Sequence, residues 1–152
     1  MMRLSHRAYY GSNGLFAAME YSLAHAAGWK YEIPPDVRGN IDVEWGFHVE
    51  QDALFAMRTG TYLTPEMMPK DPLLLIVWHE PEEGIIPAFA VPALAARIAE
   101  LRDPALAVAR REFPNWFEKR EFDKEPPLPG ALDRLIAGLS LAAKRNEKIT
   151  FS

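Results

Sequence analysis

The stretch from Ile41 to Glu50 alternates between apolar side chains at odd positions and polar side chains or glycine at even positions. A β-strand directs successive side chains to opposite faces of its sheet, so this alternation predicts a strand with one buried and one solvated face. We expect Val43, Trp45 and Phe47 on the buried face. A chain with such a strand has to build a sheet and to cover its apolar side.

Two more segments of the first half of the chain have clear patterns. Apolar residues recur at helical spacing over residues 14–27, with Ser12 or Asn13 available as the N-cap and Gly28 just beyond the end. The continuous apolar run over residues 73–78 is typical of a strand buried on both faces. We expect this run to be the centre of the sheet.

The second half of the chain is predicted to be mainly helical. One helix opens at Pro92, and Asp103 followed by Pro104 is expected to end it and start another, because this pair suits the first turn of a helix. A last helix carries Leu135 on its apolar stripe. Residues 149–151 alternate once and are expected to add an edge strand.

Length and composition fit one folded domain. The 152 residues, taken as a single domain over residues 1–152, carry 49% hydrophobic and 25% charged side chains. The order of elements predicts the α+β class, with a small, mainly antiparallel sheet packed against a set of helices. Whether residues 52–58 form a strand or a helix stays open at this level, because both periodicities fit.

Several classes of protein are disfavoured by composition. The absence of cysteine excludes disulfides, thiolate metal sites and cysteine nucleophiles. A net charge of −4 makes a nucleic-acid partner unlikely, since such proteins neutralise many phosphates. No apolar run approaches the length that crosses a bilayer, and the N-terminal residues lack a signal-peptide pattern. We therefore expect a soluble, cytoplasmic protein without a membrane partner.

The polar face of the predicted strand gathers Asp42, Glu44, His48 and Glu50, and His79 follows the apolar run. Same-face neighbours on a strand lie about 6.8 Å apart, so carboxylates and imidazoles here can reach a shared divalent cation. Asp42, Glu44, His48 and His79 are the candidate metal ligands. The simpler interpretation is a solvated strand face whose acidic residues are neutralised by basic residues of neighbouring elements. If this face binds a partner, Glu44, His48 and Glu50 are the candidate binding residues.

A second candidate surface lies near residue 116. Trp116 and Phe117 stand among alternating basic and acidic residues. Aromatic side chains next to arginine are typical of protein interfaces, although packing into the core explains the same pattern. Both residues are candidate binding residues.

Two hypotheses about function follow. The first is a small soluble protein-interaction or regulatory module without catalytic activity, with no cofactor and with another protein as its partner. The alternative is a metal-dependent hydrolase that uses the carboxylate and histidine cluster and requires a divalent metal. The oligomeric state is not indicated by the sequence.

Overall fold

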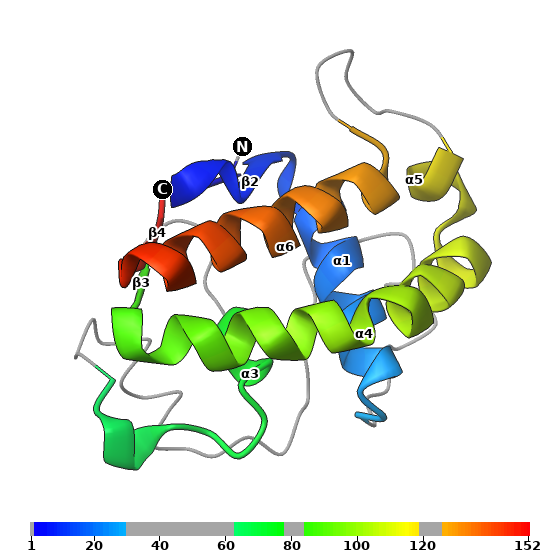
Figure 1. Ribbon diagram of the computed structural model, residues 1–152. Coiled ribbons are helices and arrows are strands. Elements are labelled where there is room, and N and C mark those ends of the chain that lie inside the picture. Colours follow the sequence, from blue (N-terminus) through cyan, green and yellow to red (C-terminus); the bar gives the residue numbers. More distant parts are fainter. Residues whose placement is uncertain (1, 30–62, 78–83, 119–125) are drawn as a thin grey trace.

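The computed structural model describes residues 2–29, 63–77, 84–118 and 126–152 (Figure 1). The strand predicted over residues 41–50 and the open segment 52–58 lie outside these ranges. The described elements in chain order are β1 (Met2–Leu4), η1 (Ser5–Arg7), β2 (Tyr9–Gly11), α1 (Asn13–Ala26), η3 (Pro65–Met67), α3 (Leu74–Val77), β3 (Gly84–Ile86), η4 (Ala88–Ala90), α4 (Val91–Glu112), α5 (Pro114–Glu118), α6 (Leu128–Arg145) and β4 (Ile149–Phe151).

The four short strands form one antiparallel sheet in the order β2-β1-β4-β3. β1 and β2 form a hairpin, in which Arg3 pairs with Tyr10. The two ends of the chain meet, because Arg3 and Ser152 exchange backbone hydrogen bonds of 2.8 and 3.0 Å. The sheet therefore joins the N-terminal hairpin to the end of α6.

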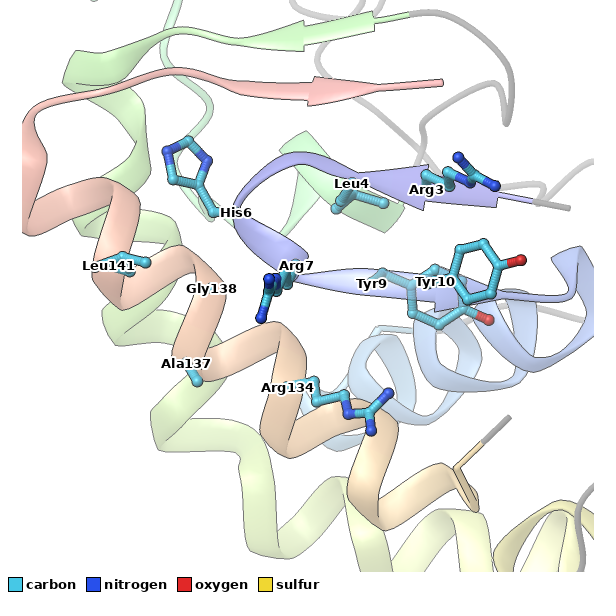
Figure 2. A pocket seen from close by; sticks show the side chains of 10 residues that line it. All are labelled: Arg3, Leu4, His6, Arg7, Tyr9, Tyr10, Arg134, Ala137, Gly138 and Leu141. Carbon is cyan, nitrogen blue, oxygen red and sulfur yellow. The ribbon is translucent and has the colours of Figure 1, made fainter. Parts of the chain in front are cut away.

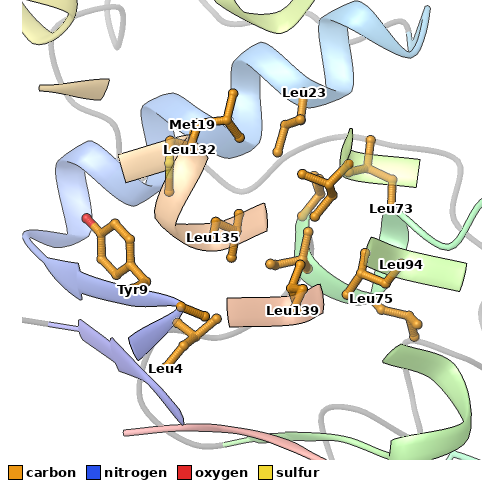
Figure 3. Close-up of a cluster of buried hydrophobic side chains, with 14 of the residues drawn as sticks. Leu4, Tyr9, Met19, Leu23, Leu73, Leu75, Leu94, Leu132, Leu135 and Leu139 are labelled. Carbon is orange, nitrogen blue, oxygen red and sulfur yellow. The ribbon is translucent and has the colours of Figure 1, made fainter. Parts of the chain in front are cut away.

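Three long helices supply most of the described core. Figure 1 shows α4 and α6 running side by side, with α1 behind them and the sheet at one end. Their facing surfaces carry leucines at helical spacing, which bury a continuous apolar stripe. Figure 3 shows side chains from the hairpin, α1, α3, α4 and α6 meeting in this core, among them Leu4, Tyr9, Met19, Leu23, Leu73, Leu75, Leu94, Leu132, Leu135 and Leu139.

The predicted first helix is confirmed as α1, including both of its ends. The Ser12 side chain accepts a hydrogen bond of 3.2 Å from the backbone N–H of Leu15, which is the N-cap interaction expected for serine. Beyond the last turn, Gly28 has a φ of +80°, a conformation that glycine adopts without steric cost. Local sequence signals were sufficient for this helix.

The predicted central strand over residues 73–78 is wrong. Residues Leu74–Val77 form the short helix α3, with all four side chains buried. The side chain of Asp71 accepts a 3.0 Å hydrogen bond from the N–H of Leu73 and so starts the helical turn. Because a run that is apolar throughout has no periodicity, it cannot distinguish a buried strand from a buried helix.

The predicted break at Asp103 and Pro104 is also wrong, since α4 continues through both residues. A proline inside a helix removes one backbone hydrogen bond and costs about 3 kcal/mol. Leu101, Ala105 and Ala109 lie on one buried stripe across this point. We infer that burial of this stripe against α1 and α6 offsets the lost hydrogen bond.

The last strand is present but lies in the interior of the sheet, so its predicted edge position is wrong. β4 pairs with β1 on one side and with β3 on the other. Its Ile149 and Phe151 side chains are buried, and their burial anchors the strand. The α+β class is confirmed: a small antiparallel sheet packs against helices around a shared core. Of the helices in the described ranges, none has the length and apolar character required to cross a membrane.

Candidate functional site

The residues predicted to hold a metal or to form an acidic binding face all lie outside the described part of the chain. They are Asp42, Glu44, His48, Glu50 and His79. Within the described ranges, no group of three or more histidine and carboxylate side chains is arranged to hold a metal ion. The metal site and the acidic binding face stay predictions.

The two aromatic candidates lie on α5, half-buried against the core. The indole of Trp116 covers Gly14 so closely that a Cβ atom there would lie 2.8 Å from its Cη2 atom. The ring of Phe117 lies under the guanidinium of Arg110, with 4.8 Å between the guanidinium carbon and the ring centroid. Both side chains thus have packing partners within the chain, and their binding role stays a prediction.

An open pocket of about 670 Å³ lies between the β1–β2 hairpin and α6 (Figure 2). We call it the hairpin pocket. Its volume falls within the range of ordinary small-ligand sites. Cationic and aromatic side chains dominate the wall, and among the described residues that line it none is acidic. The lining residues are Arg3, Leu4, His6, Arg7, Tyr9, Tyr10, Arg134, Ala137, Gly138 and Leu141.

The arginines of the hairpin pocket have no carboxylate partners among the residues that the structure describes. Arg7 comes from the hairpin and Arg134 from α6, both are exposed, and within the described part of the chain neither forms an ion pair or a side-chain hydrogen bond. Arg3 lies over the ring of Tyr10, 4.9 Å from its centroid. In a protein with a net charge of −4, this wall concentrates positive charge that no described carboxylate compensates.

The turn that carries Arg7 is held in an unfavourable backbone conformation. His6 and Arg7 have φ values of 59° and 55°, in the left-handed region that side chains with a Cβ atom rarely adopt. Each such residue costs about 1 kcal/mol or more and persists only where its surroundings impose it. Glycine would fit both positions at lower cost, yet the chain has two long cationic or ionisable side chains there.

Polar contacts on one side of the turn hold it in place. His6 Nε2 lies 2.8 Å from Glu147 Oε2, and His6 Nδ1 lies 3.0 Å from Ser5 Oγ. The same Ser5 hydroxyl accepts a 3.0 Å hydrogen bond from the N–H of Thr150 in β4. An imidazole with its proton on Nε2 satisfies all three contacts, with Ser5 donating to Nδ1.

This Ser5–His6–Glu147 arrangement resembles a hydrolytic triad only in composition. A nucleophilic serine needs its hydroxyl exposed to the substrate. Ser5 does not line the hairpin pocket, and its oxygen accepts from the β4 backbone. The arrangement fastens the turn to the end of the sheet.

A close contact with α6 holds the other side of the turn. A Cβ atom at Gly138 would lie only 2.4 Å from the Cα atom of Ala8. No side chain other than hydrogen fits between this helix and the hairpin. The contact sets the separation between the two walls of the hairpin pocket, one bearing Arg7 and the other Arg134 (Figure 2).

One ionisable side chain of the core has a shifted pKa. Burial raises the pKa of the Glu20 carboxyl, on α1, well above its usual range. Desolvation is the cause of this rise in pKa, because burial disfavours the charged carboxylate. Its carboxyl holds a proton to higher pH than an exposed glutamate.

The sequence interpretation missed the hairpin pocket. The wall that the hairpin contributes did have a signal in the sequence, because five of its cationic, ionisable or aromatic residues fall within eight positions: Arg3, His6, Arg7, Tyr9 and Tyr10. The contribution of α6 had no such signal, because it depends on packing between segments far apart in the chain.

The chain matches no protein-family model, and comparison with curated proteins and with solved structures finds no similar protein.

Proposed function

We propose that the protein is an interaction module without catalytic activity, and that it binds an acidic segment of another protein in the hairpin pocket. The observation that carries the proposal is the pair Arg7 and Arg134, two exposed guanidiniums that line one pocket from the hairpin and from α6 and that have no carboxylate partner among the described residues. Unpaired guanidiniums bind carboxylate and phosphate oxygens through charge-assisted, bidentate hydrogen bonds.

The other lining residues fit a protein partner. Tyr10 and Leu141 are 40% and 37% exposed, and they are two of four large hydrophobic side chains this exposed in the described part of the chain. Tyrosine and arginine are enriched at the energetic centres of protein interfaces. Apolar contacts for a peptide thus lie beside the groups that would bind its acidic side chains. The cytoplasmic location expected from the sequence belongs to this proposal.

A fluorescein-labelled decapeptide of alternating glutamate and glycine tests the proposal by fluorescence anisotropy. We expect binding that weakens with added salt and that falls at least tenfold in the double variant Arg7→Gln, Arg134→Gln. Arg102→Gln is the matched control, because that guanidinium is already bonded to Asp133 and should leave the affinity unchanged.

Two results would contradict the proposal. Absence of binding at low salt removes the anion site itself. Binding that persists in the double variant but is lost in Phe117→Ala moves the interaction to α5, the second surface predicted from the sequence.

A further inference from the structure

We infer that the hairpin pocket selects a phosphorylated side chain, phosphoserine or phosphothreonine, in the partner segment. This inference rests on the proposed function and narrows the ligand from acidic groups in general to a phosphate monoester. It follows from the number and the placement of the guanidinium groups and from the ordered backbone of the turn that carries Arg7.

Charge is the first argument. Arg7 and Arg134 bring two permanent positive charges to one pocket, and no described carboxylate neutralises them there. A glutamate side chain supplies a single negative charge and compensates one of them. A phosphate monoester carries about −1.5 to −2 at pH 7 and compensates both. Only the phosphate monoester balances the charge of both guanidiniums.

Hydrogen-bonding geometry is the second argument. Each guanidinium presents two parallel N–H groups to an oxygen pair, and a phosphate monoester has three terminal oxygens that can be shared between two such groups. Arg7 extends from the hairpin and Arg134 from α6, so they reach the pocket from different walls (Figure 2). A planar carboxylate has two oxygens for both forks, whereas a tetrahedral phosphate monoester offers three oxygens in different directions.

The left-handed turn is the third argument. Arg7 has an unfavourable φ of 55°, next to His6 at 59°. The contacts of His6 with Glu147 and of Ala8 with Gly138 hold this backbone before any ligand arrives. Because the backbone that carries Arg7 is already ordered, less conformational entropy is lost when the pocket binds a ligand.

A single phosphate fits this site better than the continuous backbone of a nucleic acid. The carboxylate of Glu147 lies 2.8 Å from His6 Nε2, and the cation nearest in the chain to Arg134 that the structure pairs across the helices, Arg102, is bonded to Asp133. A nucleic-acid site needs a track of cations that neutralises successive phosphates. Tyr10, with Arg3 stacked on it, instead offers a flat contact for the residue next to the phosphate.

Small probes test the inference without assumptions about peptide sequence. Backbone amide signals of ¹⁵N-labelled protein are followed by NMR during titration with N-acetyl-O-phosphoserine amide, N-acetylglutamate amide or N-acetylserine amide at constant ionic strength. We expect saturable shifts confined to residues 3–10 and 134–141, with phosphoserine bound at least tenfold more tightly than glutamate and no binding of serine. Arg7→Gln and Arg134→Gln should each weaken phosphoserine binding at least tenfold, while Arg97→Gln should not.

The outcomes separate this inference from the proposed function. Equal affinity for the phosphoserine and glutamate probes overturns the inference and leaves an acidic-segment site intact. No shift with either probe, together with no binding of the glutamate decapeptide, overturns both. Stronger competition by a thymidine decanucleotide than by the phosphoserine probe, at equal phosphate concentration, assigns the pocket to nucleic acid and also overturns the inference.

Discussion

The arginines of α4 and those of the hairpin pocket use the same functional group in opposite ways. On α4, Arg97 forms hydrogen bonds of 3.1 and 3.0 Å to the two carboxylate oxygens of Asp71, and Arg102 forms bonds of 2.7 and 3.2 Å to those of Asp133. Hydrogen bonding to Asp71 raises the pKa of Arg97 further above its usual range. Arg7 has no such partner within the described residues.

The difference shows which cations contribute to the fold and which are available to a ligand. Asp71 also caps α3, so its pair with Arg97 ties α3 to α4. The Arg7 side chain forms no ion pair or hydrogen bond within the described ranges, although its backbone conformation is costly. Backbone strain of this kind is typical of binding sites. Each prediction below alters one side of this comparison.

The largest effect is expected from Gly138→Val, which forces α6 away from Ala8. Overpacking at a rigid contact costs about 3 kcal/mol, and it also separates the walls that bear Arg7 and Arg134, so anion affinity should be lost. Urea unfolding measures the free energy of unfolding. Ala137→Val is the control for stability. It places the same side chain at the exposed position before Gly138, so it measures the helix-propensity cost of valine without the contact with Ala8. Equal losses in the two variants would mean that the close contact does not matter.

Next in size is Asp71→Ala, which acts on the paired side of the comparison. It removes the less exposed of the two carboxylate partners of Arg97 and, with it, the cap of α3. The free energy of unfolding should fall by about 1–2 kcal/mol. Glu100→Ala is the control, since Glu100 is the more exposed of the two Arg97 partners and caps nothing. Affinity for the phosphoserine probe should be unchanged. A drop in affinity would show that the two groups of arginines are not independent.

A smaller effect, of opposite sign, is expected from Arg7→Gly. Glycine tolerates a positive φ, so the free energy of unfolding should rise by about 0.5–1 kcal/mol relative to Arg7→Ala, which keeps the strain. Both variants should lose phosphoserine binding to the same extent. If the glycine variant is no more stable than the alanine variant, the turn is not strained and the pre-organisation argument fails.

The smallest effect is expected from Arg102→Gln. Its bonds to Asp133 and Asp103 lie on the surface, where solvent screens ion pairs strongly. Neither the midpoint of urea unfolding nor the affinity for the phosphoserine probe should change measurably. A clear loss of affinity would place Arg102 within the reach of the ligand.

Local signals in the sequence predicted the parts of the fold that local physics determines. Ser12 and Gly28 define the two ends of α1 through hydrogen bonding and backbone conformation, and neither depends on the rest of the chain. The prediction of a break at Pro104 was wrong because the outcome there does not depend on local interactions alone. The cost of a proline inside a helix is local, but the burial that offsets it comes from helices distant in sequence.

The candidate site was less predictable than the fold because it is assembled by tertiary contacts. The triplet Ser5–His6–Arg7 gives no sequence sign of a positive φ, since such a backbone is expected at glycine. Arg134 looks like any exposed residue of an amphipathic helix until the contact between Gly138 and Ala8 brings the hairpin beside it. Asp71 shows the converse, a capping residue overlooked because the apolar run after it resembled a strand.

The most direct test follows the Nε–Hε signals of the arginine side chains by NMR as inorganic phosphate is added at constant ionic strength. We predict saturable shifts for Arg7 and Arg134, with Arg97 and Arg102 unmoved because Asp71 and Asp133 already occupy their donors. Shifts of similar size for all four arginines, or none at Arg7 and Arg134, would show that the hairpin pocket is not a selective anion site.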